Sequence, residues 1–231
     1  MSFIFEPALI TSLPIVGVSA RFPVHRVFCV GQNYAKHAQE MGASGREAPF
    51  FFMKPARSVV PVEADHVQPI PYPEGTKELH HEVELVVAIG REGNQISPEN
   101  AAEYIYGYAV GLDLTRRDLQ AELKAKGRPW EIAKGFEASA PVGPITPLAK
   151  TGELLNADLS LEIDGEVRQQ GNMDEMIWSV NEIISLLSTH WNLTAGDLIF
   201  TGTPAGVGPL AVGNQLQGQI SGLQPLQVKV V

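Results

Sequence analysis

The chain has 231 residues, 44% of them hydrophobic, with a formal net charge of −9 at pH 7, which predicts a globular protein with a sizeable core rather than a disordered one. Phosphate binding needs clustered Lys and Arg, so the acidic balance argues against a nucleic-acid partner. No apolar stretch approaches the roughly 18–20 residues of a membrane span.

Cys29 is the single cysteine, so no intrachain disulfide can form and a reducing compartment is expected. The N-terminal stretch MSFIFEPALI has no basic start and no long apolar core, unlike a signal peptide. We therefore expect a cytoplasmic protein with no membrane partner.

Strand signals dominate the chain. Residues 1–24 are punctuated by proline and are expected to form an N-terminal arm, with residues 25–231 as a single domain. Apolar, β-branched runs predict strands at Arg26–Val30, Phe50–Lys54, Glu82–Ile89, Tyr104–Leu114, Leu159–Ile163, Glu166–Gln170, Asp197–Thr201 and Gln227–Val231. The proline-rich residues 61–78 are expected to form an extended loop.

Predicted helices are few and short. Asn33 is expected to cap a helix over Tyr34–Met41, and Ser97 precedes a short helix that begins with proline. Thr115 is expected to cap a polar helix, and Ser179 with Glu182 forms a capping box for another. Because the strands and helices do not alternate regularly, the fold class predicted is mainly β or α+β.

The most informative motif is HHEVELVVAI. Glu82 and Glu84 are two residues apart, so on a strand both carboxylates share one face. Asp113 ends a second strand-like run, and if the two strands are neighbours the three carboxylates converge and repel one another unless a cation neutralises them. All-oxygen ligation suits Mg²⁺ or Mn²⁺. The alternative is a solvated sheet face, but Val86 and Ala88 on the same face favour an enclosed site.

Other polar residues have a functional and a purely structural interpretation. His37 and Glu40 lie three apart on the predicted helix, where they form either a general-base pair or a surface pair. Lys134, in the apolar run WEIAKGF, either contacts an anionic ligand or reaches solvent. Arg116 and Arg117 follow Asp113 and either clamp a substrate carboxylate or are solvated.

Two further features are ambiguous in the same way. The glycine-rich loop TGTPAGVGP either brings backbone N–H groups close to an anion or is a tight connection between strands. Tyr72, Trp130 and Phe136 are interpreted as packing residues.

Six segments in this order resemble the fumarylacetoacetate hydrolase family. They are GQNYAKHAQEM, FFMKP, HHEVELVVAIG, YGYAVGLDLTRRDLQ, PWEIAKGFEASAPVGP and GDLIFTGTPAGVGP, and the similarity runs from about Val27 to the C-terminus. The nearest resemblance is to the short branch of acylpyruvate hydrolases and oxaloacetate decarboxylases. It implies a fold consisting of a β-rich roll with short helices, usually in a homodimer.

The resemblance also implies roles for individual residues. It implies Mg²⁺ or Mn²⁺ held by Glu82, Glu84 and Asp113. It implies a water-activating dyad, His37 and Glu40, on a segment that can act as a lid, with Lys134 beside the substrate. The remaining positions that match the family's substrate pocket are Lys54, Arg117, Gln120 and Thr203.

The activity implied is hydrolysis of a carbon–carbon bond in an acylpyruvate, such as fumarylpyruvate or acetylpyruvate, to give pyruvate and a carboxylic acid. Loss of CO₂ from oxaloacetate forms the same enolate, and tautomerisation needs only the enolate and a proton shuttle. Oxaloacetate decarboxylase or tautomerase, or a 2-hydroxyhepta-2,4-diene-1,7-dioate isomerase, is therefore the alternative. A non-catalytic protein that binds a divalent ion or a small acid would have no use for His37 and Glu40, whose presence favours hydrolysis.

Overall fold

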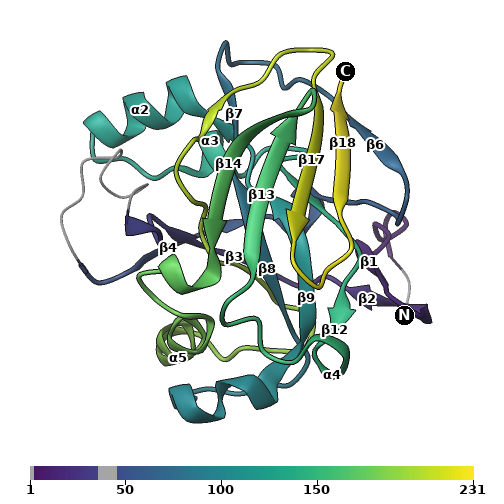
Figure 1. Cartoon of the computed structure of the whole chain (residues 1–231), viewed down its shortest axis with the longest axis vertical. Helices are drawn as coiled ribbons and strands as arrows, with labels where there is room; N and C mark the ends of the chain where they lie inside the picture. Colours follow the sequence, from purple (N-terminus) through teal and green to yellow (C-terminus); the bar gives the residue numbers. More distant parts are fainter. Residues whose placement is uncertain (1–2, 36–45) are drawn as a thin grey trace.

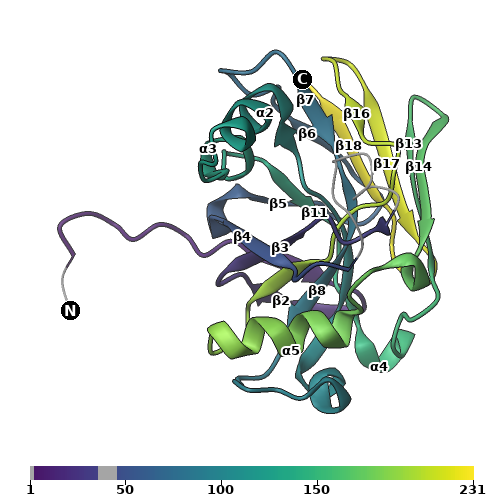
Figure 2. The ribbon, with the colours of Figure 1, turned by 90° about the vertical axis from the view of Figure 1, so that its left-hand side faces the viewer.

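Strands dominate the fold, which confirms the mainly-β or α+β class predicted from the sequence. The computed structural model describes residues 3–35 and 46–231, and the chain is 39% strand and 19% helix. Figure 1 shows two sheets in the middle of the molecule with short helices around them. In Figure 2 the segment that precedes the first strand extends away from the body.

The larger sheet brings distant parts of the sequence together. Its strand order is β4-β3-β15-β8-β9-β11-β5, with β12 paired to β9. The strands are β3 (Val27–Gly31), β4 (Phe50–Lys54), β5 (Val59–Pro61), β8 (Val83–Ile89), β9 (Ile105–Leu112), β11 (Ala140–Val142), β12 (Thr146–Pro147) and β15 (Leu198–Phe200). Because β8 is antiparallel to β9 and β15, and β15 is parallel to β3, the start of β8 lies beside the ends of those three strands.

The second sheet has the order β14-β13-β17-β18-β6. Its strands are β6 (Val67–Ile70), β13 (Asp158–Ile163), β14 (Glu166–Asn172), β17 (Gln215–Ile220) and β18 (Leu226–Val230). The predicted strands at Leu159–Ile163 and Glu166–Gln170 correspond to β13 and β14, which form a hairpin whose turn residues Asp164 and Gly165 have φ of 53° and 82°. Positive φ at both central positions is the conformation that Asp-Gly favours in a two-residue hairpin.

The remaining elements are short. One small sheet consists of β1 (Ser12–Ile15) and β2 (Val18–Pro23). Another has the order β10-β7-β16, with β7 (Leu79–His81), β10 (Thr115–Arg116) and β16 (Gly208–Pro209). The α-helices described are α2 (Arg117–Ala125), α3 (Glu131–Lys134), α4 (Leu148–Thr151) and α5 (Val180–His190). The 3₁₀ helices described are η1 (Ala56–Ser58), η2 (Pro98–Tyr104) and η3 (Met173–Glu175).

Both faces of β8 are buried. Val83, Leu85 and Val87 pack into the core shared with the second sheet, and Val86 and Ala88 pack into a separate core that includes residues of β1 and β2. This alternation follows from the strand period of two and confirms the faces predicted from the sequence. Glu84 therefore points into the interior from a strand that is anchored on both sides.

The structure differs from the sequence prediction in two segments. Residues 61–78, expected as a loop because of their prolines, contain β6, which pairs in parallel with β18. Proline is tolerated there because β6 is an edge strand, where Pro69 need not donate a ladder hydrogen bond. Thr115, expected to cap a helix, instead pairs with His80 in a short strand, and α2 begins at Arg117.

Candidate metal centre and active site

Strand register brings three carboxylates together. Val83 of β8 pairs with Leu112 of β9, and directly beyond this pair the Asp113 N–H donates to the Glu82 carbonyl oxygen at 2.9 Å. Glu84 lies one pair further along β8. One carboxylate oxygen from each of Glu82, Glu84 and Asp113 lies within 4.8 Å of the other two, and all three residues are buried.

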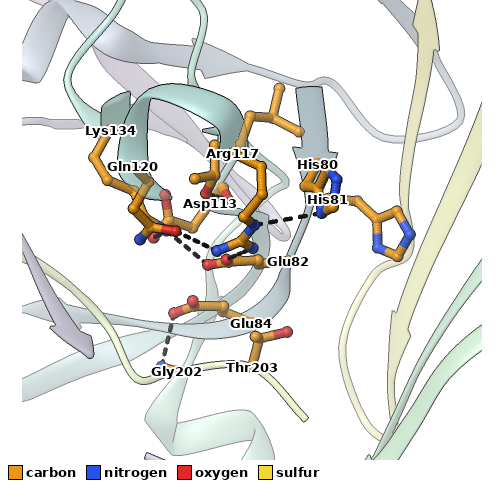
Figure 3. Close-up of polar contacts among 12 residues, drawn as sticks. His80, His81, Glu82, Glu84, Asp113, Arg117, Gln120, Lys134, Gly202 and Thr203 are labelled. Atoms are coloured by element: carbon orange, nitrogen blue, oxygen red, sulfur yellow. Dashed lines mark hydrogen bonds and ion pairs between the residues drawn. The ribbon is translucent and has the colours of Figure 1, made fainter. Parts of the chain in front are cut away.

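Cationic side chains surround this triad (Figure 3). Lys134 Nζ lies 2.7 Å from Glu82 Oε2 and 2.8 Å from Asp113 Oδ2. The Arg117 guanidinium pairs with the other oxygen of Glu82. Lys54 Nζ lies 2.8 Å from Asp113 Oδ1. These cations make the desolvated carboxylates tolerable, because a buried charge without a partner is strongly destabilising.

Burial and the neighbouring charges set the protonation of the site. Burial raises the pKa of the Glu84 carboxyl well above its ordinary range, and repulsion from Asp113 and Glu82 raises it further. Burial alone would lower the pKa of Lys134, but the negative charges of Asp113 and Glu82 outweigh it and raise that pKa. Lys134 therefore keeps its proton and acts as a cation rather than as a base.

The triad is able to bind a metal ion. Asp113 Oδ1 accepts no hydrogen bond from the described residues, although Lys54 Nζ is close to it. A hard divalent ion takes carboxylate oxygens as ligands and would remove the repulsion that raises the Glu84 pKa. The donor set thus fits the cofactor expected from the sequence, Mg²⁺ or Mn²⁺.

The loop after β15 closes the site from the opposite side. The Gly202 N–H donates to Glu84 Oε2 at 2.7 Å, and Thr203 Oγ1 donates to the Val83 carbonyl oxygen at 2.8 Å. Gly202 has φ of 98°, and a Cβ there would lie 2.7 Å from Asn33 Cβ. Glycine is therefore required for this loop to approach Glu84 so closely.

Gln169 connects the second sheet to this loop. Its Oε1 accepts the Val83 N–H at 3.1 Å, and its Nε2 donates to Thr203 Oγ1 at 2.8 Å and to the Pro204 carbonyl oxygen at 2.9 Å. His81 Nδ1 lies 2.9 Å from the same Oε1. Gln169 is 1% exposed, so it fixes Thr203 against β8 from a fully buried position.

A pocket opens over the triad. Besides the three carboxylates it is lined by Val30, Gly31, Gln32, Phe52, Arg117, Gln120, Trp130, Lys134, Gly202 and Thr203. Arg117 also donates to Gln120 Oε1, and its Nε lies 3.4 Å from His80 Nδ1. Burial, followed by the charge of Arg117, lowers the pKa of His80 to about 4, so His80 is a neutral acceptor near pH 7.

The structure brings most of the predicted site residues together. Arg117, Gln120, Lys134 and Thr203 line the triad pocket with the three carboxylates. Lys54 instead lies behind it, 1% exposed, where its ammonium donates to the Leu114 carbonyl oxygen and to Ser139 Oγ. The predicted dyad, His37 and Glu40, lies outside the described residues.

Among the pocket residues that were not identified from the sequence are Trp130 and Gln32. Trp130, interpreted as a packing residue, lines the triad pocket. Gln32 also lines it and has φ of 58°, an uncommon conformation for a residue other than glycine. The signal available in the sequence was their position, since Gln32 follows a buried strand and Trp130 precedes the lysine of α3. Gln169 gave no signal, because nothing distinguishes it from its neighbour Gln170.

The chain is similar to known proteins along most of its length. Residues 26–231 match the family model described as fumarylacetoacetate (FAA) hydrolase C-terminal. Oxaloacetate tautomerase YcgM of Escherichia coli is 44% identical over 201 residues, 87% of this chain and 90% of the relative. The mitochondrial oxaloacetate decarboxylase of Dictyostelium discoideum is 40% identical over 198 residues, 86% of this chain and 89% of the relative.

A solved structure is similar over the whole length. The crystal structure of fumarylpyruvate hydrolase from Pseudomonas aeruginosa, in complex with Mn²⁺ and pyruvate, is 51% identical with a TM-score of 0.98. The match covers 100% of this chain and 99% of that one. Among the described residues of the present chain, no helix is long and apolar enough to cross a bilayer.

Proposed function

The chain belongs to the fumarylacetoacetate hydrolase family, and we propose that it is a metal-dependent hydrolase that cleaves an acylpyruvate to pyruvate and a carboxylic acid. The observation that carries the proposal is the buried triad of Glu82, Glu84 and Asp113 with Lys134 and Arg117 beside it in one pocket. Such a pocket suits a small anion that must be held while negative charge develops on it. The high identity to a fumarylpyruvate hydrolase along the entire chain supports the same reaction.

Glu82, Glu84 and Asp113 would hold Mg²⁺ or Mn²⁺. The ion, when bound, supplies a Lewis acid that stabilises negative charge developing on a substrate oxygen. Lys134 and Arg117 are the cations that attract and orient the keto-acid end of the substrate, while Gln120 and Thr203 offer hydrogen bonds from two sides of the pocket. Lys54 acts on the substrate through Asp113 and the backbone around Lys134, which it positions.

The proposed reaction consumes one water. The dyad of His37 and Glu40 takes a proton from that water, and the hydroxyl adds to the acyl carbonyl carbon. The bond between this carbon and the neighbouring methylene then breaks, and its electron pair leaves as the enolate of pyruvate. A proton on the methylene carbon completes pyruvate, and the other product is the carboxylate of the acyl group.

A substrate panel with added Mn²⁺ or Mg²⁺ tests the proposal. Hydrolysis is followed by the ultraviolet loss of the acylpyruvate enol, with pyruvate and the carboxylic acid quantified as equimolar products. We expect turnover of fumarylpyruvate or acetylpyruvate to exceed that of oxaloacetate in kcat/KM. A protein that turns over oxaloacetate alone would contradict the proposal.

The second candidate is an oxaloacetate tautomerase or decarboxylase, which the names of curated relatives with 40–44% identity favour. Neither reaction needs an attacking water. The variant Glu40→Gln should therefore suppress hydrolysis much more than oxaloacetate turnover. Equal losses for both substrates in this variant would favour the second candidate.

We also propose that the enzyme is a cytoplasmic homodimer with an N-terminal arm at 1–24 and a catalytic domain at 25–231. The segment before β1 carries exposed apolar side chains, Phe3, Ile4, Phe5, Leu9 and Ile10, with 65–102% of their surface accessible. A second copy of the chain would bury such a segment, since isolated apolar side chains gain free energy by leaving water. Light scattering of the full-length protein would reveal a dimer, and a monomer at micromolar concentration would contradict this proposal.

A further inference from the structure

Beside the triad pocket lies a second pocket, and we propose that it binds the distal carboxylate of an acylpyruvate whose acyl group is a planar diacid. The inference rests on the proposed function and specifies its substrate class. It is carried by the side chains of this outer pocket, which combine aromatic walls with two cations. They are Gln32, Phe50, Phe51, Phe52, Lys124, Arg128, Pro129, Trp130 and Glu131.

The two pockets are adjacent. Gln32, Phe52 and Trp130 line both of them, so these residues form the boundary between the inner and the outer space. The outer pocket is the roomier of the two and is open to solvent. A ligand whose keto-acid end is held at the triad would reach the outer pocket by passing Trp130.

Helix α2 sets the distance between the two ends of such a ligand. Arg117, Gln120 and Lys124 are spaced i, i+3 and i+7, so they share one face of the helix. Arg117 and Gln120 line the inner pocket, whereas Lys124 lines the outer one. With a rise of 1.5 Å per residue, Lys124 lies about 10 Å along the axis from Arg117.

The end of α2 adds the second cation. Gly127, with φ of 60°, reverses the chain, and the Arg128 N–H donates to the Leu123 carbonyl oxygen at 2.9 Å. This contact holds Arg128 at the mouth of the outer pocket. The Arg128 guanidinium forms no ion pair within 4 Å among residues 3–35 and 46–231, although its charge helps to lower the pKa of the nearby Glu122 carboxyl. The charged side chains described in the lining of the outer pocket are Lys124, Arg128 and Glu131.

The opposite wall is aromatic. The ring of Trp130 lies edge-on to Phe50 and Phe52, with centroid distances of 5.2 Å and 6.1 Å. These contacts fix the orientation of the indole between the two pockets. A flat, conjugated chain can pack on such rings along its length, while a saturated polar chain would lose its hydration there without compensation.

The combined features predict the acyl group. It should be unsaturated and end in a carboxylate, as in fumarylpyruvate, because its chain then passes the aromatic wall and its charge reaches Lys124 and Arg128. Acetylpyruvate has nothing to place in the outer pocket. Oxaloacetate, a four-carbon diacid, is too short to span about two turns of helix between the inner cations and Lys124.

Binding of two matched ligands to the Mn²⁺-loaded protein tests the pocket without any turnover. 2-Oxoheptanedioate and 2-oxoheptanoate have the same length and the same keto-acid end, and only the former ends in a carboxylate. Calorimetry should give a dissociation constant about 5- to 30-fold lower for the diacid, the range expected for one or two exposed ion pairs. Equal dissociation constants would overturn the inference.

Substitutions test whether Lys124 and Arg128 cause the preference for the diacid. Arg128→Ala and Lys124→Ala should each reduce the preference for the diacid up to about fivefold, and the double variant should remove it. Lys126→Ala is the control, because Lys126 is also exposed at the same helix end and lines neither pocket. A preference that survives in the double variant, or falls as much in Lys126→Ala, would overturn the assignment of these residues.

The same variants separate this inference from the proposed function. In native protein the ratio of kcat/KM for fumarylpyruvate to that for acetylpyruvate should be high, and Arg128→Ala should lower this ratio through KM. A protein that hydrolyses no acylpyruvate yet prefers 2-oxoheptanedioate would contradict the proposed function and support the outer pocket. A protein that hydrolyses both substrates with a ratio near one would support the function and overturn the inference.

Discussion

The inner and outer pockets use charge in opposite ways. In the inner pocket, Glu82, Glu84, Asp113 and Lys134 are 1–5% exposed, and most of these charges are paired within 3 Å. In the outer pocket Lys124 and Arg128 are exposed at the end of a helix. Buried charges interact strongly and tolerate little change, whereas exposed charges interact weakly and can be exchanged cheaply.

Under the proposed function, this contrast assigns a task to each region. The inner pocket is built on β8 and β9, where register fixes the carboxylates before any ligand arrives, and it is suited to the bond-breaking step. The outer pocket is built on the end of α2 and the residues that follow, and it is suited to distinguishing one acyl group from another. Relatives that act on different keto acids can therefore share the first and differ in the second.

The largest effect expected is from removal of the metal. Exhaustive chelation, or Glu84→Ala, should abolish turnover of every substrate, because the proposed reaction needs the Lewis acid that the ion would supply. The ion binds the native state only, so at a hundredfold excess over Kd it should add about 2.7 kcal/mol to the free energy of unfolding. Full turnover after chelation, checked by elemental analysis, would contradict the metal assignment.

Next in size is the loss of the proposed dyad. His37→Ala and Glu40→Ala should lower kcat for acylpyruvate hydrolysis about 10²- to 10⁴-fold, the usual contribution of a general base. Mn²⁺ affinity, measured by calorimetry, should stay within a few-fold of native in both variants, since neither residue is a proposed ligand. Native hydrolysis rates in His37→Ala would show that the water is activated elsewhere.

Lys134 gives a smaller effect that is confined to the inner pocket. Lys134→Met keeps the length of the side chain but leaves Glu82 and Asp113 without its charge, which should cost about 3–5 kcal/mol in the metal-free protein. Added Mn²⁺ should restore part of this loss because it neutralises the same carboxylates. Urea unfolding with and without Mn²⁺ measures both the loss in the free energy of unfolding and the part that the ion restores.

Lys126→Met is the matched control for this variant. Lys126 is exposed and its ion pair with Glu122 lies at the surface, where such pairs contribute about 0–1 kcal/mol. If Lys134→Met destabilises the metal-free protein no more than Lys126→Met does, the contrast between buried and exposed charge is wrong for this molecule.

Sequence reasoning succeeded where a local pattern determines the structure. The period-two alternation of 83–88 placed Glu84 on the correct face, and the capping box of Ser179 and Glu182 is present at the start of α5. The Asp164-Gly165 turn also follows from two residues alone. The sequence predicted that Asp113 lies close to Glu82 only if β8 and β9 are neighbouring strands, and the sequence alone does not determine that pairing.

Sequence reasoning was less successful where the structure of a segment depends on a partner far away in the chain. β6 forms because β18, some 160 residues later, offers an edge, and no property of residues 67–70 announces that partner. Lys54 matches a substrate position by the resemblance; its ammonium lies beside Asp113 and Ser139, and its contact with substrate stays a prediction. The boundary role of Trp130 depends on Phe50 and Phe52, which reach it from a different strand.

Gln169 gives the smallest effect expected, because it lies one layer behind the inner pocket. Gln169→Ala would leave the buried Val83 N–H and the Pro204 carbonyl oxygen without this partner, at a cost of about 1–3 kcal/mol in the free energy of unfolding. It would also release Thr203 Oγ1 from the Gln169 amide, so kcat/KM should fall by more than the loss of folded protein explains. Its neighbour Gln170 is exposed on the same strand, and Gln170→Ala should change stability by less than about 0.5 kcal/mol and leave kcat/KM at the native value. If the two variants behave alike, the second sheet supports the fold without positioning the catalytic loop, and the inner pocket is held by the larger sheet alone.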